Sequence, residues 1–111
     1  MKSSRHAVTS LLLITLIGQA FADNVSTNKI PLEKLQAVVQ AKGCASCHGT
    51  RGQGNPAMKG PRLAGQTADA LASKLRDYRN GEIKNPTMNV MAYRLSDQDI
   101  VELSGYFSRF Q

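Results

Sequence analysis

The chain has 111 residues, of which 20% are charged and 41% hydrophobic. This length accommodates one small domain and excludes the larger enzyme scaffolds, and the composition is that of a globular rather than a disordered protein. Lysine and arginine number 14 against 8 aspartate and glutamate residues, which gives a formal net charge of +6.

The amino-terminal segment has the pattern of a secretory signal peptide. Lys2 and Arg5 precede the apolar run at residues 11–17, and a small-residue site follows at 20–22. The run is too short to span a bilayer, which takes about 20 apolar residues. We therefore predict a cleaved signal peptide at 1–22, export to the periplasm and a mature chain without a transmembrane segment. Losing Lys2 and Arg5 lowers the net charge from +6 to +4.

A polar stretch and a first helix follow the predicted cleavage site. Residues 23–30 are predicted to form a flexible leader, and the folded domain is expected to cover 31–111. Pro31 suits the first position of a helix, and Lys42 and Gly43 predict its end. The apolar residues that share one face of this helix are Leu35, Val38 and Val39.

The middle of the chain is rich in glycine and proline between residues 43 and 66, which predicts one long irregular loop. Loops of this length in compact domains are usually functional. Thr67 then predicts the cap of a second helix that ends at about Asn80. Residues 82–95 are predicted to form another connection, with a turn at the Asn-Pro pair of positions 85 and 86.

The last helix is predicted to begin after Ser96, with Asp99 at the capping-box position. The residues expected on its buried face are Ile100, Leu103 and Phe107. No segment alternates in the manner of a β-strand with β-branched residues. The sequence therefore predicts an all-α fold, with three or more helices joined by long loops.

Cys44, Cys47 and His48 form a C-x-x-C-H motif, which is typical of the attachment of a c-type haem. Each thiol can form a thioether with one vinyl group of the ring, and the adjacent imidazole then becomes the proximal ligand of the iron. A covalently bound apolar ring would also complete the core of so short a chain. We predict one haem c per chain.

Three other readings of the cysteine pair explain fewer features. A redox-active dithiol is expected in a βαβ setting, and no strand pattern precedes Cys44. A simple disulfide leaves His48 unexplained. A structural zinc ion takes four ligands, and the mature chain offers only three cysteine and histidine residues because His6 lies in the predicted signal peptide.

The chain resembles the class I c-type cytochromes from residue 32 to its end. Besides the C-x-x-C-H motif, the resemblance is carried by residues 60–66 (GPRLAGQ), by Met88 and by residues 95–100 (LSDQDI), which open the last helix. It is strongest to small bacterial monohaem cytochromes, or to one half of the dihaem periplasmic cytochromes. The resemblance implies the cytochrome c fold, with helices and long loops wrapped around one covalently bound haem.

The sixth ligand of the iron is open from residue types alone. Met58, Met88, Met91 or no ligand at all are the candidates, and chain length excludes none of the methionines. The resemblance favours Met88, which lies eight residues before Ser96, and leaves Met91 as the alternative. Met58 and Met91 are then expected to fill the core.

The resemblance also assigns supporting roles around the haem. It implies that the Pro61 carbonyl accepts a hydrogen bond from the His48 ring and thereby orients it, which places Met58 near the wrong face. Candidates for hydrogen bonds to the haem propionates are Gln66, Tyr78 and Asn85. Glycines expected to allow a close approach of the backbone to the haem are Gly43, Gly49 and Gly65. Gly105 is expected to let the first and last helices cross closely.

These features predict a periplasmic one-electron carrier with His/Met ligation rather than an enzyme, because no catalytic constellation is present beyond the haem. The positive charge predicts redox protein partners with acidic docking surfaces and a monomeric carrier. Nucleic acid is excluded, because the basic residues Lys74, Arg76 and Arg79 are spread around one helix. The alternatives are a haem subunit or accessory domain of a larger oxidoreductase, or a haem enzyme with an open sixth position.

Overall fold

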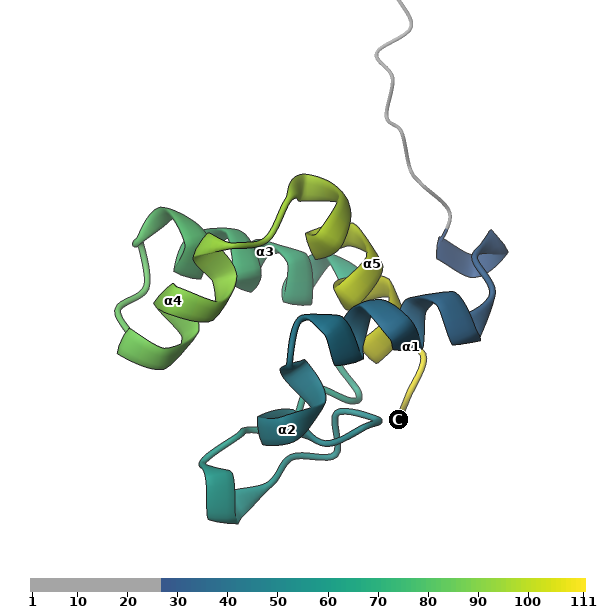
Figure 1. Cartoon of the computed structure of the whole chain (residues 1–111), viewed down its shortest axis with the longest axis horizontal. Helices are drawn as coiled ribbons and strands as arrows, with labels where there is room; N and C mark the ends of the chain where they lie inside the picture. The colour runs from purple at the N-terminus through teal and green to yellow at the C-terminus, as the bar shows by residue number, and fades with distance from the viewer. Residues whose placement is uncertain (1–26) are drawn as a thin grey trace, which may run out of the picture.

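The computed structural model describes residues 27–111, so the predicted signal peptide lies outside the described residues. Its elements in chain order are η1 (Thr27–Lys29), α1 (Leu32–Ala41), α2 (Cys44–His48), η2 (Pro56–Met58), α3 (Ala68–Asn80), α4 (Pro86–Tyr93) and α5 (Asp97–Phe107) (Figure 1). Extended pairing in this part of the chain is limited to one isolated bridge between Asn55 and Gly60. The predicted all-α fold is confirmed.

The core lies where α5 packs against α1 on one side and against α3 on the other, while α4 packs against α3. In Figure 1, α2 and the loop after it lie below α1, on the opposite side from α3. The most deeply buried large side chains are Leu35, Val39, Ile100 and Leu103. They come from the faces of α1 and α5 that the apolar spacing predicts. Within residues 27–111, none of the helices combines the length and apolar character needed to cross a membrane.

The predicted caps of α3 and α5 are formed. The Thr67 side chain accepts a hydrogen bond of 3.1 Å from the backbone N–H of Ala70. Ser96 and Asp99 make a reciprocal capping box. The Ser96 hydroxyl accepts a hydrogen bond of 3.0 Å from the backbone N–H of Asp99, and the Asp99 carboxylate accepts one of 2.9 Å from the backbone N–H of Ser96. Each cap satisfies amide groups that the first turn of a helix leaves without partners, so these two boundaries follow from local sequence.

The connection predicted over residues 82–95 is wrong, because residues 86–93 form the helix α4. Asn85 caps it by accepting a hydrogen bond of 3.0 Å from the N–H of Met88, and Pro86 occupies the first turn. An Asn-Pro pair serves equally in a turn and at the start of a helix. Tertiary contacts favour the helix, since the Asn89 amide donates to the carbonyls of Tyr78 and Ile83 at 2.8 Å.

The long loop predicted over residues 43–66 is also corrected, because it contains the short helices α2 and η2. The five residues of α2 include both cysteines and the histidine of the C-x-x-C-H motif. An isolated helix this short is unstable in water and has no room for a periodic apolar pattern. Its presence depends on packing that the sequence pattern does not reveal.

Part of the predicted leader contacts the end of the chain. Arg109 donates hydrogen bonds to the carbonyl oxygens of Thr27 and Ile30, while residues 23–26 lie outside the described residues. A Cβ atom added at Gly105 would meet the side chain of Thr27. The nearest neighbour of Gly105 is therefore η1, while α5 also packs against α1.

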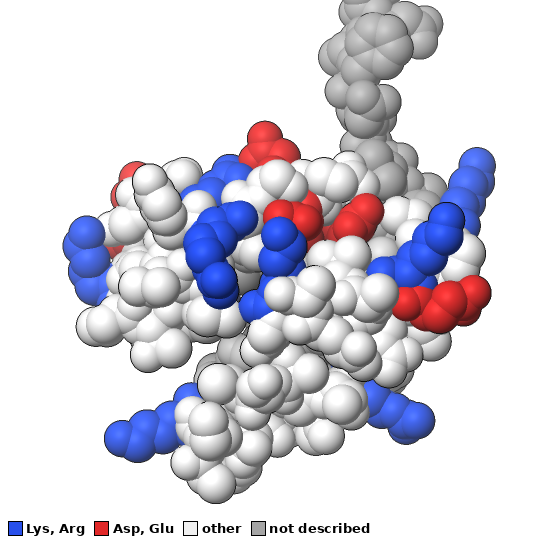
Figure 2. Space-filling view, viewed as in Figure 1, with Lys and Arg blue, Asp and Glu red and all other residues white. Residues whose placement is uncertain are grey.

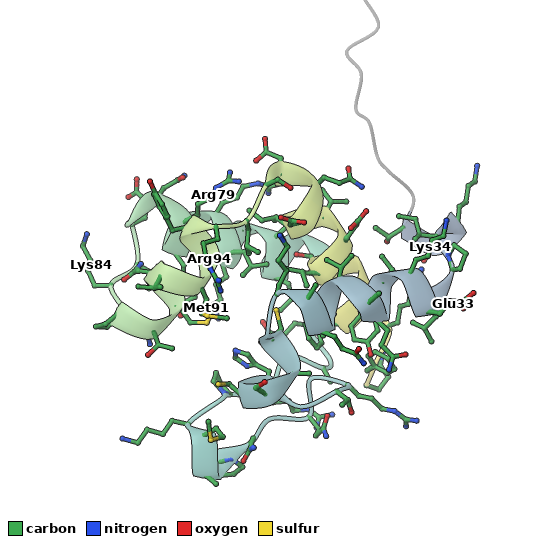
Figure 3. All side chains as sticks on the ribbon, viewed as in Figure 1. Glu33, Lys34, Arg79, Lys84, Met91 and Arg94 are labelled. Carbon is green, nitrogen blue, oxygen red and sulfur yellow. The ribbon has the colours of Figure 1, made fainter. Side chains whose placement is uncertain are left out.

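Basic side chains occur at both ends of the described domain. Figure 2 shows lysine and arginine over several parts of one face. Figure 3 places Lys34 at the start of α1 and Lys84 in the loop before α4, at opposite ends of the domain. Two ion pairs join helices: Lys42 with Asp99 at 3.0 Å and Arg79 with Asp97 at 2.8 Å. The first is the more enclosed, because the Asp99 side chain is 17% exposed against 84% for Asp97.

We expect Asp99→Asn to lower the free energy of unfolding by about 1 kcal/mol at neutral pH. Burial opposes ionisation of Asp99, but hydrogen bonds from Ser96 and Lys42 outweigh it and lower the pKa of this carboxyl. A lowered folded-state pKa stabilises the protein above the unfolded value of about 3.9, and that stabilisation is lost as the pH falls through the folded value.

Urea unfolding at neutral pH and near pH 3 measures this difference, with Asp97→Asn as the matched control. The exposed Asp97 pair is expected to contribute between 0 and about 1 kcal/mol. A stability loss in Asp99→Asn that persists unchanged in acid would contradict the role of the carboxylate charge.

Candidate functional site

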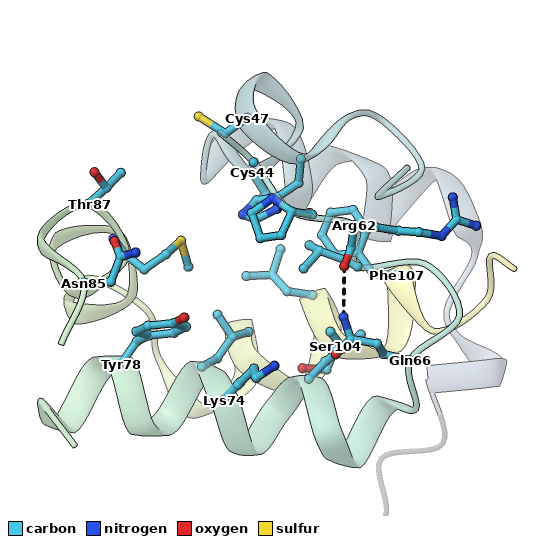
Figure 4. A pocket seen from close by; sticks show the side chains of 18 of the residues that line it. Cys44, Cys47, Arg62, Gln66, Lys74, Tyr78, Asn85, Thr87, Ser104 and Phe107 are labelled. Atoms are coloured by element: carbon cyan, nitrogen blue, oxygen red, sulfur yellow. Dashed lines mark hydrogen bonds between the residues drawn. The ribbon is translucent and has the colours of Figure 1, made fainter. Parts of the chain in front are cut away.

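A cavity of about 420 Å³ lies between α2 and α4 and is bounded by α3 and α5 (Figure 4). Its apolar wall includes Leu71, Leu75, Leu103 and Phe107. The side chains with ligand chemistry that line it are Cys44, Cys47, His48, Met58 and Met88. The fold therefore brings both cysteines, the histidine and two of the three candidate methionines to a single space.

The helix α2 sets the geometry of the motif. It is preceded by Gly43 and followed by Gly49, which have left-handed φ angles of 77° and 86°. One helical turn places Cys44, Cys47 and His48 on the same side, because positions i, i+3 and i+4 are neighbours on a helix. All three line the cavity.

The thiol of Cys44 is half-buried and protonated at neutral pH. Burial raises its pKa from the ordinary thiol value to about 11. Redox-active thiols instead have lowered pKa values, because the thiolate is the nucleophile. The environment of Cys44 does not favour a dithiol redox site and agrees with a covalent attachment point in an apolar wall.

The ring of His48 is buried and held in one orientation. It is 7% exposed, and its Nδ1 lies 2.8 Å from the carbonyl oxygen of Pro61. A carbonyl only accepts, so Nδ1 carries the proton and Nε2 keeps its lone pair. This is the tautomer that suits an axial metal ligand.

The loop after the motif is tied to the rest of the domain by backbone groups. The N–H of Gly54 donates to the carbonyl of His48 at 2.8 Å, and the hydroxyl of Tyr106 in α5 donates to the carbonyl of Thr50 at 2.6 Å. Burial raises the pKa of Tyr106, so its hydroxyl stays protonated as the donor. These bonds help to hold the segment that carries Pro61.

The glycine in closest contact with the motif is Gly60, the first residue of the GPRLAGQ stretch, for which no role was predicted. A Cβ atom there would overlap the carbonyl oxygen of Cys47, 13 residues earlier in the chain. The glycines predicted to approach the haem are absent from the cavity wall, whereas Gly60 lines it. Those three, Gly43, Gly49 and Gly65, have positive φ angles, so their role in the described domain is conformational.

We expect Gly60→Ala to lower the free energy of unfolding by about 1–3 kcal/mol, because the added methyl group meets backbone rather than a side chain that can move. Chemical unfolding of the haem-loaded protein measures this effect. Gly65→Asn is the control, since no atom lies within 4 Å of its Cβ position and asparagine tolerates a positive φ. Equal unfolding midpoints for Gly60→Ala and the wild type would contradict this packing.

The three methionines of the described domain occupy different environments. Met88 lines the cavity, and Met91 does not. The methyl group of Met91 lies near Gly43, and its sulfur accepts a hydrogen bond of 3.5 Å from Arg94. Met58 borders the cavity but is 54% exposed, so the prediction that it fills the core is wrong. The structure thus groups Met88, and not Met91, with His48.

The predicted propionate contacts all border the cavity, but their groups are not equally available. The Gln66 amide donates to the carbonyl of Arg62 at 3.0 Å, and the Asn85 side-chain oxygen is used as the cap of α4. Tyr78 also lines the space. Among the described residues, the cavity wall contains the cations Lys59, Arg62 and Lys74 and no carboxylate. This cluster of three cations was not predicted from the sequence. It suits a site that binds an anionic group.

The cavity fits haem c on its own chemistry. Two thiols stand beside an imidazole with a free Nε2, a soft thioether is supplied by α4, and the remaining wall is mostly apolar. The hydroxyl of Ser104 borders this space and is buried without a hydrogen-bond partner in the described domain. An unpaired buried polar atom is uncommon in a folded protein and is explained where a bound group completes the interior.

Comparison with known proteins gives one consistent family. Residues 32–109 match the family described as Cytochrome c. The thiosulfate dehydrogenase electron acceptor of Thiomonas intermedia is 38% identical over 81 residues, which are 73% of this chain and 37% of that protein. Cytochrome c-554(548) of Halomonas halodenitrificans is 43% identical over 68 residues, which are 59% and 81% of the two chains. Cytochrome c4 of Azotobacter vinelandii is 39% identical over 67 residues, or 57% and 32%.

The chain therefore aligns with about a third of two of these relatives and with four fifths of the other. The family match covers most of the described domain, including the C-x-x-C-H motif and all of the helices from α1 to α5. Cytochromes c are electron-transfer proteins rather than enzymes. The match and the fold together show that this chain belongs to the cytochrome c family, as a small class I c-type cytochrome.

Proposed function

We propose that the protein is a periplasmic one-electron carrier with one covalently bound haem c and His/Met axial ligation. Cys44 and Cys47 would supply the thioether bonds, His48 the proximal ligand and Met88 the distal ligand. The observation that carries the proposal is the position of these four side chains around one largely apolar cavity. The 2.8 Å contact between His48 Nδ1 and the Pro61 carbonyl supports the ligand role of Nε2.

When bound, the haem supplies an iron centre that takes up and releases one electron. The protein's own residues attach the group, orient its ligand and exclude water. Pro61 fixes the ring of His48, the apolar wall lowers the local dielectric, and the Met88 thioether would favour the ferrous state. Ligation by both His48 and Met88 would leave no site for a substrate, which favours a carrier over a haem enzyme.

Redox proteins with acidic docking surfaces are the partners we propose. Two relatives, from Thiomonas intermedia and Stutzerimonas stutzeri, are named as electron acceptors of thiosulfate dehydrogenase. The cavity wall contributes three cations and no carboxylate among the described residues, and removal of residues 1–22 would leave a net charge of +4. Such a field attracts acidic partners at low salt. A cleaved signal peptide at 1–22 would deliver a monomeric carrier to the periplasm.

A second function is a haem domain or subunit of a larger oxidoreductase. This alternative is favoured by the alignment with only 37% and 32% of two relatives, which are therefore much longer proteins. The chemistry at the cavity would be unchanged, but the partner would be permanent. The migration of the native protein in size-exclusion chromatography separates the two functions.

Expression with the signal peptide in a host that attaches haem c tests the main proposal. We expect haem staining that survives a denaturing gel, a sulfur-to-iron charge-transfer band in the oxidised protein and no binding of carbon monoxide by the reduced protein at neutral pH. Carbon monoxide binding would point to an open sixth position and a haem enzyme. Absence of covalent haem in the matured protein would refute the carrier function.

A further inference from the structure

The outer face of α4 exposes an apolar pair. Val90 and Tyr93 are 65% and 79% exposed, and they make up half of the four large apolar side chains exposed within residues 27–111. Their spacing of three positions places them next to each other on one helix face. A shallow depression of about 580 Å³ adjoins them, between α4 and the end of α3. We call Val90, Tyr93 and this depression the α4 face.

The depression of the α4 face is lined by basic side chains. The depression is lined by Arg79, Lys84 and Arg94 and by no carboxylate of the described residues. Arg79 is already paired with Asp97 at 2.8 Å. Lys84 and Arg94 have no ion-pair partner in the part of the chain that the structure describes, which leaves two positive charges for an external group.

The figures show the same arrangement. In Figure 3, Lys84 extends from the loop before α4, while Arg94 lies by the other end of that helix. Figure 2 shows an uncharged stretch of surface over α4 with basic side chains on two sides of it. A central apolar contact with a charged rim is the usual anatomy of a protein interface, and tyrosine and arginine are the residues most enriched there.

The α4 face also lies directly behind the cavity. Met88 is two residues before Val90 and faces the cavity from the same helix. Tyr78 lines both the cavity and the depression. Only α4 and the side chain of Tyr78 thus separate a protein bound at the α4 face from the proposed haem site.

We propose that the α4 face is a docking surface for an acidic redox protein. Val90 and Tyr93 make the apolar contact, and Lys84 and Arg94 pair with carboxylates of the partner. This inference rests on the proposed carrier function. One electron passes in the complex, so that the carrier is reduced as the partner is oxidised, or the reverse, and no bond or proton changes. A second copy of this chain is disfavoured as occupant, because two α4 faces would bring like charges together.

Charge reversal in the haem-loaded protein tests the docking surface. The probe is a purified, negatively charged blue copper protein, and stopped-flow spectroscopy measures the second-order rate constant of electron transfer. We expect Lys84→Glu/Arg94→Glu to lower this constant about tenfold or more at low ionic strength and much less in high salt. The control with the same charge change is Lys29→Glu/Lys34→Glu at the opposite end of the domain, for which we expect less than a threefold loss.

A second variant pair isolates the apolar contact. Tyr93→Ser is expected to lower the rate constant severalfold with little dependence on salt. Leu32→Ser removes an apolar side chain that is 43% exposed on α1, and it should leave the rate unchanged. The visible spectrum and the reduction potential are expected to stay the same in all four variants, which shows that the carrier itself is intact.

Binding without electron transfer separates this inference from the carrier function. Titration with the copper-free form of the probe, followed by amide NMR shifts, should change the signals around Lys84, Val90, Tyr93 and Arg94. Shifts confined to the cavity mouth at Lys59 and Arg62 would overturn the α4 face as docking surface. Equal rate losses in both charge-reversal variants, or a micromolar dimer that Tyr93→Ser dissociates, would overturn it as well. A folded, haem-loaded protein that neither accepts nor donates an electron would refute the carrier function, while this titration still reported on docking.

Discussion

Replacing both Cys44 and Cys47 by alanine is expected to remove covalent haem and to leave a chain without a stable fold. The apolar side chains of α3 and α5 that line the cavity would then surround an empty space. At about 24 cal/mol per Å³, an empty cavity of about 420 Å³ costs on the order of 10 kcal/mol. The whole stability of a domain is about 5–15 kcal/mol, so a loss of this size unfolds the protein.

A haem-stained denaturing gel and thermal unfolding followed by circular dichroism measure these effects. The single cysteine variants should keep partial attachment, because each thiol makes its own thioether. Ser46→Ala, an exposed position in the same helical turn, is the control and should keep haem and stability. Wild-type chain made without haem-ligation machinery is expected to resemble the double variant.

Two results would contradict this expectation. Haem that stays on the double variant through a denaturing gel would refute the attachment role of the cysteines. A sharp two-state thermal transition in the haem-free chain would show that the apolar core suffices without the cofactor.

Replacing Met88 by alanine is expected to abolish the sulfur-to-iron charge-transfer band and to lower the reduction potential. Met88 lines the cavity opposite the motif, and a thioether stabilises ferrous iron. Axial ligands tune haem potentials over a range of about 0.8 V, so a fall on the order of 0.1 V or more is expected. The visible spectrum of the oxidised protein and a potentiometric titration measure both changes.

Met91→Ala is the matched control, because it removes the same side chain from the same helix. Met91 contacts Gly43 and Arg94 rather than the cavity, so its loss should keep the band. Its expected effect is a lower free energy of unfolding, by about 2 kcal/mol for a partly buried methionine. A band that survives in Met88→Ala and vanishes in Met91→Ala would move the ligand to Met91.

Local chemistry determined what was predictable from the sequence. The spacing of Cys44, Cys47 and His48 predicts haem attachment without reference to the rest of the fold. The caps at Thr67 and Ser96 act on amide groups within three residues, so the starts of α3 and α5 were predicted correctly. An all-α fold followed from the apolar spacing between these caps.

Contacts between distant parts of the chain decided the rest. α4 depends on packing against α3 and on the bonds of Asn89 to the preceding turn, so the Asn-Pro pair at its start could not be distinguished from a turn. The orientation of α4 in turn sends Met88, and not Met91, into the cavity, although both are the same residue type three positions apart. Gly60 is required because its backbone meets Cys47 across 13 residues of loop. Such pairings form only when the helices pack, because no interaction within one helical turn specifies them.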